Sequence, residues 1–205
     1  MCPSPKSKNN AEDGGNQEQE TPTWAVRRLL EELYLPPGIW LEPCAGTGRA
    51  IEAFDEDRPG QIEFHAIELR SAGRPYLEAQ RNCKVYCPYD FIEWNVRDFF
   101  SGTNPYFDVA FAHPPFDIGF EVVSKCLVLA KNVVVLQHLG WLDSGRRNGK
   151  NEFLKNCVPD IYVLPNPIAA EQHAFFHWPP VENRFKDCGQ TINLRETSEE
   201  ERIRG

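Results

Sequence analysis

Residues 38–50, GIWLEPCAGTGRA, set an alternation of strand, turn and helix that the chain then continues. The apolar run 38–42 has the length of a short buried strand and passes directly into a turn of small residues. Gly46 and Gly48 let a ligand approach the backbone of this turn closely, because glycine has no Cβ. A helix over residues 50–55 follows. The turn lacks the lysine of a P-loop and the third glycine of a dinucleotide fingerprint, so it indicates a ligand site without naming the ligand.

Apolar runs of strand length recur along the chain and alternate with segments of helical periodicity. The strands that the sequence predicts are residues 38–42, 63–68, 84–87, 107–112, 133–136, 161–164 and 174–178. The helices that it predicts are residues 24–33, 50–55, 73–82, 118–130 and 152–156. We expect Thr21 or Thr23 to cap the first helix. The alternation predicts an α/β fold with a mostly parallel, seven-stranded sheet and helices on both faces.

The composition indicates one globular domain between polar tails. Of the 205 residues, 41% are hydrophobic and 25% are charged, which is ordinary for a globular protein. We assign residues 21–180 to the domain, residues 1–20 to a disordered tail and residues 181–205 to a polar tail. The seven cysteines are scattered without a framework or a zinc-like spacing. This predicts reduced thiols, no metal site and a cytoplasmic location. No signal peptide or membrane-spanning stretch is expected.

The charge of the chain restricts how it contacts nucleic acid. A formal net charge of −8 argues against a broad surface that coats a polyanion. One local basic segment, residues 145–150, contains Arg146, Arg147 and Lys150. It is either a solvated loop or a phosphate-binding loop, and its place after the fifth predicted strand suits the second role.

A residue suited to ligand binding follows each of the first four predicted strands. These residues are Gly46, Glu68, Asp90 and His113. In parallel sheets, ligands bind outside the carboxyl ends of the strands, where the four would meet. An acidic residue such as Glu68, ending the strand after a glycine turn, typically binds ribose hydroxyls, and Asp90 can accept a hydrogen bond from an adenine amine beside Phe91. Together they predict a pocket for an adenosine-containing cofactor, although Glu68 and Asp90 taken singly also suit capping or solvated positions.

The fourth of these strands ends in His113-Pro114-Pro115-Phe116. Two consecutive prolines stiffen the loop and remove two backbone donors. The loop is then a rigid platform that presents one polar side chain and one aromatic ring. Such a platform suits a flat substrate that forms hydrogen bonds, although Pro-Pro is also ordinary in loops.

The motifs in this order resemble those of the class I S-adenosylmethionine-dependent methyltransferases, which have a Rossmann-like fold. The resemblance rests on residues 42–48 (EPCAGTG), 66–69 (AIEL), 90–91 (DF) and 113–116 (HPPF), and it covers about residues 21–180. Within that class, the chain is similar to the DNA amino-methyltransferases, which modify the exocyclic amine of adenine or cytosine. Their hallmark is Asn, Asp or Ser followed by Pro-Pro and an aromatic residue after the fourth strand.

The resemblance implies roles for residues on the cofactor side. Thr21 and Pro22 resemble the segment that closes over the methionine of S-adenosylmethionine. The residues implied to line the methionine and ribose end are Glu42, Pro43, Ala45, Gly46 and Gly48. Glu68 would bind the ribose hydroxyls, and Asp90 and Phe91 the adenine.

On the substrate side, the resemblance implies that Phe116 stacks on a base flipped out of its helix. His113 and the carbonyl of Pro114 would accept hydrogen bonds from the target amine, and Pro115 would stiffen the loop. This orientation points the nitrogen lone pair at the methyl group, and positioning of this kind supplies much of the catalysis.

The sequence departs from the family pattern at two places. His113 stands where the family has Asn, Asp or Ser. A neutral imidazole has one acceptor and a protonated one has none, so we expect activity to fall as the pH drops through the pKa of His113, with the loss visible above pH 5. In addition, only a short polar segment follows Trp178, which leaves no room for a target-recognition domain. We therefore expect that sequence specificity is low, that the recognised sequence is short, or that a partner supplies the specificity.

Three functions remain open from the sequence. The first is methyl transfer to a nucleic-acid base, with adenine in DNA as the leading target. The second is methylation of RNA or of a protein glutamine, since related Pro-Pro loops also serve those substrates. The third is a cofactor-binding module whose catalysis has been lost through His113. The sequence predicts no oligomeric state.

Overall fold

The computed structural model describes residues 20–102, 105–141, 158–168, 170–180, 190–194 and 196. Within them, eight strands form one sheet in the order β3-β2-β1-β4-β5-β7-β6-β8. The strands are β1 Gly38–Pro43, β2 Ile62–Ile67, β3 Cys83–Tyr86, β4 Phe107–Ala112, β5 Ala130–His138, β6 Asp160–Val163, β7 His173–Trp178 and β8 Thr191–Asn193. The five strands from β3 to β5 are parallel, whereas β7 runs antiparallel to both β5 and β6.

The mostly parallel α/β sheet that the sequence predicts is confirmed, with one strand more than expected. The additional strand, β8, pairs in parallel with β6 and lies in the segment 181–205 that the composition assigns to a polar tail. Its three residues give too short a run for an alternating pattern to be recognised. Strand β5 also begins three residues earlier than predicted, directly after a helix.

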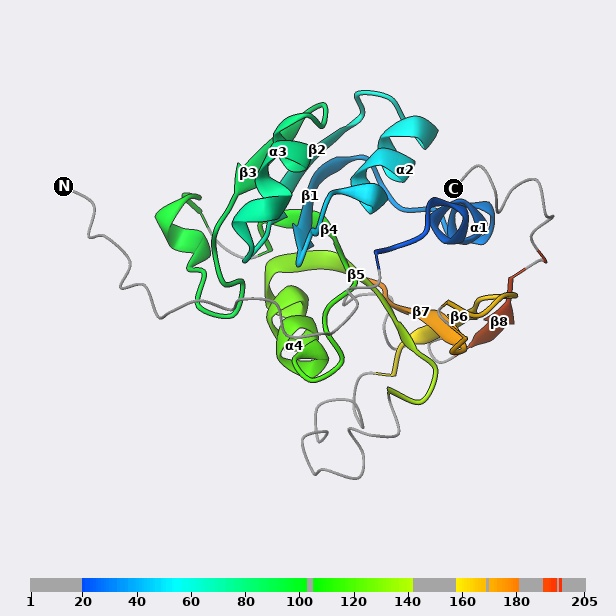
Figure 1. Cartoon of the computed structure of the whole chain (residues 1–205). Coiled ribbons are helices and arrows are strands. Elements are labelled where there is room, and N and C mark those ends of the chain that lie inside the picture. Colours follow the sequence, from blue (N-terminus) through cyan, green and yellow to red (C-terminus); the bar gives the residue numbers. More distant parts are fainter. Residues whose placement is uncertain are drawn as a thin grey trace.

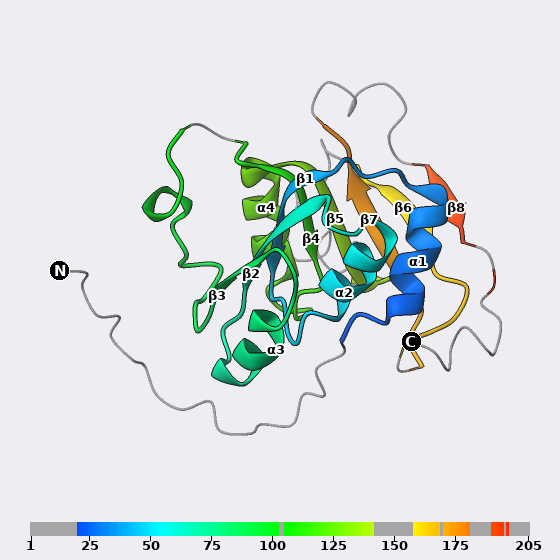
Figure 2. The ribbon, with the colours of Figure 1, turned by 90° about the horizontal axis from the view of Figure 1, so that it is seen from above.

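Helices cover both faces of the sheet, as predicted. They are α1 Thr23–Glu32, α2 Arg49–Asp57, α3 Arg74–Glu78 and α4 Gly119–Leu129, with 3₁₀ turns η1 Ser71–Gly73 and η2 Val96–Asp98. Figure 1 shows α2 and α3 on one side of the sheet and α4 on the other. The view from above in Figure 2 shows α1 and α2 side by side on the same face. The predicted helix 152–156 lies outside the described residues.

The start of α1 differs from the prediction. Its N-cap residue is Pro22, and no side chain caps the helix. The hydroxyl of Thr21 contacts the ring of His113 instead, and the hydroxyl of Thr23 is buried without a hydrogen-bond partner. A contact distant in the sequence therefore replaces the local cap.

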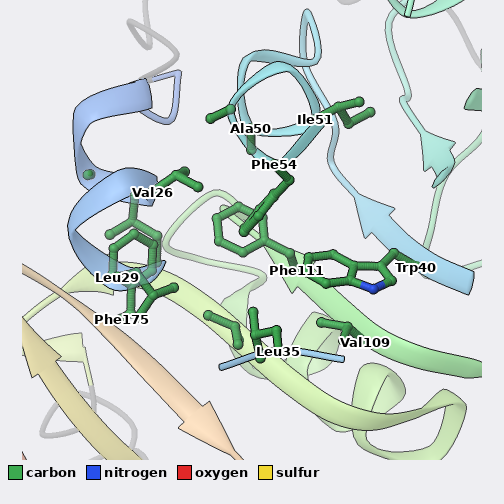
Figure 3. Packing of buried hydrophobic residues seen from close by; sticks show 14 of the residues in the cluster. Val26, Leu29, Leu35, Trp40, Ala50, Ile51, Phe54, Val109, Phe111 and Phe175 are labelled. Atoms are coloured by element: carbon green, nitrogen blue, oxygen red, sulfur yellow. The ribbon is translucent and has the colours of Figure 1, made fainter. Parts of the chain in front are cut away.

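The core beneath α1 and α2 fixes β1 and β4, whose carboxyl ends lead into the glycine turn and the Pro-Pro loop. In Figure 3, Phe54 of α2 points between Trp40 of β1 and Phe111 of β4. Its ring centroid lies 4.9 Å from that of Trp40 and 5.0 Å from that of Phe111, both in edge-on geometry. Edge-on pairs of this kind add about 0.5–1.5 kcal/mol each beyond the burial of their area. On the opposite face, α4 buries Val122 and Cys126 against the sheet.

None of the helices in the described part of the chain combines the length and the apolar character needed to cross a bilayer.

Candidate cofactor and substrate site

The carboxyl ends of β1, β2 and β3 are joined by backbone hydrogen bonds, which bring the predicted cofactor residues together. The N–H of Ala45, in the glycine turn, donates to the carbonyl of Ile67 at 3.0 Å. The N–H of Tyr89, next to Asp90, donates to the carbonyl of Glu68 at 2.9 Å. The parallel pairing of neighbouring strands thus places the three turns along one edge of the sheet.

Glu68 holds the glycine turn in place. Its side chain is 4% exposed, and Oε2 accepts a hydrogen bond from the N–H of Gly46 at 2.8 Å. Oε1 accepts from the backbone N–H of Arg70 at 2.8 Å and from its Nε at 3.0 Å. These bonds fix the orientation of the carboxylate beside the glycine turn. Burial raises the pKa of the Glu68 carboxyl, and the backbone donors oppose that shift.

The glycine turn has a left-handed backbone and a very close neighbour. Gly46 has φ of 58° and Gly48 has φ of 83°, values that favour glycine. A Cβ added to Gly73 would lie 2.5 Å from the carbonyl oxygen of Gly46. Gly73 is therefore a part of the site that the sequence did not reveal, because nothing in its spacing distinguishes it from the start of an ordinary helix.

Acidic side chains gather at the cofactor end of the site. Burial, reinforced by Glu68 nearby, raises the pKa of the Glu42 carboxyl well above its usual range. Burial, together with the charges of Glu68, Asp90 and Glu42, raises the pKa of the Cys44 thiol to about 12, so the thiol is protonated at neutral pH. Three carboxyl groups thus lie close enough to act on one thiol. This surrounding favours a ligand with a positive charge, such as an ammonium or a sulfonium.

The predicted adenine residues lie in a tight turn after β3. Asp90 is exposed, and its Oδ1 accepts a hydrogen bond from the N–H of Ile92 at 2.8 Å. Phe91 is only 4% exposed, and its ring packs in the core on the α4 face with Nζ of Lys125 at 4.8 Å from its centroid. The structure therefore brings Asp90 to the edge of the site and places the ring of Phe91 beneath it.

His113 links the Pro-Pro loop to the segment before α1. Its Nδ1 lies 3.2 Å from Oγ1 of Thr21, a residue that is 6% exposed. Burial of the ring, together with His173 nearby, lowers the pKa of His113 to about 4. The imidazole is then neutral throughout the physiological range. Desolvation therefore moves the expected loss of activity from the range of an ordinary histidine to about pH 4.

The carbonyl of Pro114, expected to accept from a target amine, already accepts a hydrogen bond. The donor is Nε2 of Gln137, the penultimate residue of β5, and the contact is buried. Oε1 of Gln137 accepts in turn from the N–H of His138 at 3.3 Å. A carbonyl has two lone pairs, so Pro114 keeps one acceptor position. Gln137 was missed from the sequence, although a polar residue at the end of the β-branched run 133–136 was a usable signal.

Three histidines from three strand ends lie in a row beside the Pro-Pro loop. The ring centroid of His173 is 6.3 Å from that of His113 and 6.1 Å from that of His138, with near-perpendicular planes. Phe116 continues the row at 6.4 Å from His138 and is 51% exposed. His173 reaches this edge because β7 is antiparallel and begins where β5 ends. Phe116 is thus available to a substrate, as predicted for a stacking residue.

Two predicted groups stand apart from this geometry. Pro22 lies at the N-cap of α1, next to Thr21. Arg146, Arg147 and Lys150 lie outside the described residues.

Comparison with known proteins adds information on the fold. No protein-family model matches the sequence, and none of the curated proteins matches it either. Solved structures do match. A dimethyladenosine transferase from Plasmodium falciparum has a TM-score of 0.52 and 18% identity, over 80% of this chain and 63% of that one. A putative RNA methyltransferase from Pyrococcus horikoshii has a TM-score of 0.56 and 15% identity, over 78% of this chain and 81% of that one.

A third similar structure is a methyltransferase subunit of a type I restriction-modification system from Streptococcus thermophilus. Its TM-score is 0.53 at 10% identity, over 78% of this chain and 43% of that one. The chain has the Rossmann-like fold of class I methyltransferases. It spans less than two thirds of the length of the first and third of these structures. At these identities the likeness concerns the fold, and the function has to be argued from the site.

Proposed function

We propose that this protein transfers a methyl group from S-adenosylmethionine to an exocyclic amine of a nucleic-acid base. One observation supports this most strongly: the contact between Thr21 and His113. Thr21 belongs to the segment that resembles a cover for the cofactor methionine, and His113 to the loop that resembles a base-binding platform. Direct methyl transfer requires cofactor and target to meet at one point, and a contact between these two segments supports such an arrangement.

The residues at the cofactor end fit S-adenosylmethionine. The acidic surroundings of Cys44, with Glu42 and Glu68, suit the positive charges of its methionine end. The carboxylate of Glu68, held beside the glycine turn, suits a ribose hydroxyl, and the exposed carboxylate of Asp90 suits the adenine amine. When bound, this cofactor supplies an electrophilic methyl group.

The residues at the substrate end orient an amine. If Nδ1 of His113 donates to Thr21, Nε2 is left as an acceptor for one N–H of the target, and the low pKa keeps it available. The free lone pair of the Pro114 carbonyl accepts the second N–H. Phe116 stacks on the base, where such stacking contributes about 1–3 kcal/mol. Held in this way by His113, Pro114 and Phe116, the amine would present its lone pair to the methyl group that the cofactor supplies.

Adenine in DNA is the target that the resemblance to the DNA amino-methyltransferases favours. RNA is the second candidate, because a putative RNA methyltransferase is among the similar structures. A partner that supplies specificity fits both targets. A cofactor-binding module without catalysis is a further candidate, because His113 stands in place of the family's Asn, Asp or Ser.

The test is transfer of labelled methyl groups from S-adenosylmethionine to separate pools of DNA, RNA and protein. We expect label in DNA, and none with a Glu68→Ala variant. Label in RNA alone, or in protein alone, would show that this polymer is the substrate in place of DNA. Cofactor binding without transfer to any pool would support a cofactor-binding module without catalysis. A gain of transfer in His113→Asn would then identify His113 as the cause of the lost activity.

A further inference from the structure

Lys125 connects two parts of the site from the middle of α4. Its Nζ donates hydrogen bonds to the carbonyl oxygens of Phe91, Ile92 and Trp94, at 2.5 Å for Phe91 and 3.0 Å for Ile92. The same atom lies 4.8 Å from the centroid of the Phe91 ring. An ammonium has three donors, and three carbonyls of one turn receive them.

The turn that Lys125 contacts is the one that presents Asp90. The N–H of Trp94 donates to the carbonyl of Asp90 at 2.8 Å, so residues 90–94 form a single helical turn. At its start, Oδ1 of Asp90 accepts from the N–H of Ile92. At its end, Lys125 donates to the carbonyls of Ile92 and Trp94, and it shares the carbonyl of Phe91 with the N–H of Trp94, which lies 3.3 Å from it. A one-turn helix is unstable alone because nucleation is costly, so the ammonium is a main source of its order.

The position of Lys125 suits a specific structural role. Its side chain is partly buried, and this burial lowers its pKa while the charge of Asp90 acts in the opposite direction. Removing a partly buried ammonium would take a donor from all three carbonyls, of which that of Phe91 would keep the N–H of Trp94. The turn is held at both ends, and the second anchor comes from a different layer of the fold.

The helix that carries Lys125 also continues the Pro-Pro loop. The N–H of Ile118 donates to the carbonyl of Pro115 at 3.3 Å, and the N–H of Val122 donates to the carbonyl of Ile118 at 3.0 Å. Lys125 thus ties the Asp90 turn to the element on which the base-binding loop is built.

We propose that Lys125 is a positioning residue that fixes the carboxylate of Asp90 for recognition of the adenine amine. This inference rests on the proposed use of S-adenosylmethionine. Lys125 acts through the turn and does not itself touch the cofactor. Its loss is expected to weaken discrimination at the adenine amine more than binding at the methionine end.

The experiment compares the full chain with Lys125→Met, with the milder Lys125→Gln, and with Lys131→Met as a control. Lys131 is also a lysine with a short contact, to Oδ1 of Asp108 at 2.8 Å, but it lies at the amino ends of β4 and β5. Two quantities are measured. One is amide hydrogen exchange at Ile92 and Trp94 without ligand. The other is the ratio of dissociation constants for S-adenosylhomocysteine and S-inosylhomocysteine. The second compound lacks the exocyclic amine of the adenine ring.

We expect exchange at Ile92 and Trp94 to be about tenfold faster in both Lys125 variants and unchanged in the control. The wild type and the control should prefer the adenosine compound by about tenfold, and the Lys125 variants by less than about threefold. Unchanged exchange, or a preserved preference in the Lys125 variants, would overturn the inference. If the wild type binds neither compound, the proposed function fails, and the exchange rates still decide whether Lys125 holds the turn.

Discussion

At the cofactor end of the site, backbone groups make the decisive contacts, whereas at the base end side chains from three strands make them. The N–H groups of Gly46 and Arg70 bind Glu68, and left-handed glycines shape the turn. At the other end, Gln137 of β5 donates to the Pro114 carbonyl, and the ring of His173 of β7 lies beside that of His113. A turn with close backbone contacts tolerates little added volume, so a single added atom group should have a large effect. In a cluster of side chains, single replacements should lower stability or methyl transfer by smaller amounts. The predictions below test this difference.

Gly73→Ala should have the largest effect, because it damages the cofactor end. The new Cβ would lie 2.5 Å from the Gly46 carbonyl and push the turn away from Glu68. Overpacking of this kind costs up to about 3 kcal/mol, or roughly 100-fold in cofactor affinity. Calorimetric titration with S-adenosylhomocysteine measures it. Ala72→Ser, which adds one atom at the exposed neighbouring residue, should bind as the wild type does, and equal binding by both variants would contradict the account.

Phe116→Ala should affect only the base end. Loss of stacking is expected to lower kcat/KM for methyl transfer by roughly 30-fold, since stacking contributes about 1–3 kcal/mol per base. Cofactor affinity and thermal stability should stay unchanged, because the side chain is 51% exposed. Val128→Ala, on an exposed part of α4, is the control for removal of a surface side chain. An equal loss of transfer in both variants would remove Phe116 from the substrate site.

Gln137→Leu should produce an intermediate effect on both stability and transfer. It leaves the buried Pro114 carbonyl without its donor, which costs about 1–3 kcal/mol of unfolding free energy. Asn132→Leu is a matched control, because its Nδ2 also joins β5 to the β4 segment, at the opposite edge, through the carbonyl of Asp108 at 3.1 Å. Denaturant unfolding should show comparable losses for both. Only Gln137→Leu should also lower transfer in the folded protein, and a similar loss in Asn132→Leu would show that stability alone is responsible.

The pH dependence should be the smallest effect near neutrality. Because the pKa of His113 is about 4 when folded and about 6.5 when unfolded, its contribution to stability is complete above pH 6.5 and declines as the pH falls towards 4. Transfer should persist to about pH 5. The advantage of the wild type over His113→Asn in unfolding free energy should shrink by up to about 2–3 kcal/mol across that interval. An activity midpoint near pH 6.5 would show that the His113 ring is not desolvated.

The comparison of the two ends also explains what the sequence could predict. The position of Glu68 beside the glycine turn was predictable, because the residue ends the strand that follows the turn. His173 was not, because it joins His113 only through the antiparallel placement of β7. Thr21 matched a local capping pattern, yet it contacts a residue 92 positions away. Phe91 matched a ligand-facing aromatic, but apolar residues in a turn give no sign of which face they occupy, and its ring lies in the core.

Nucleoside analysis by mass spectrometry of DNA incubated with the protein and S-adenosylmethionine tests the central proposal most directly. The expected result is N6-methyladenine, formed by the wild type and strongly reduced with Phe116→Ala. The same product in RNA alone would support the proposed reaction, with RNA in place of DNA as the substrate. A protein that binds S-adenosylhomocysteine but leaves no methylated base in either DNA or RNA would contradict the proposal.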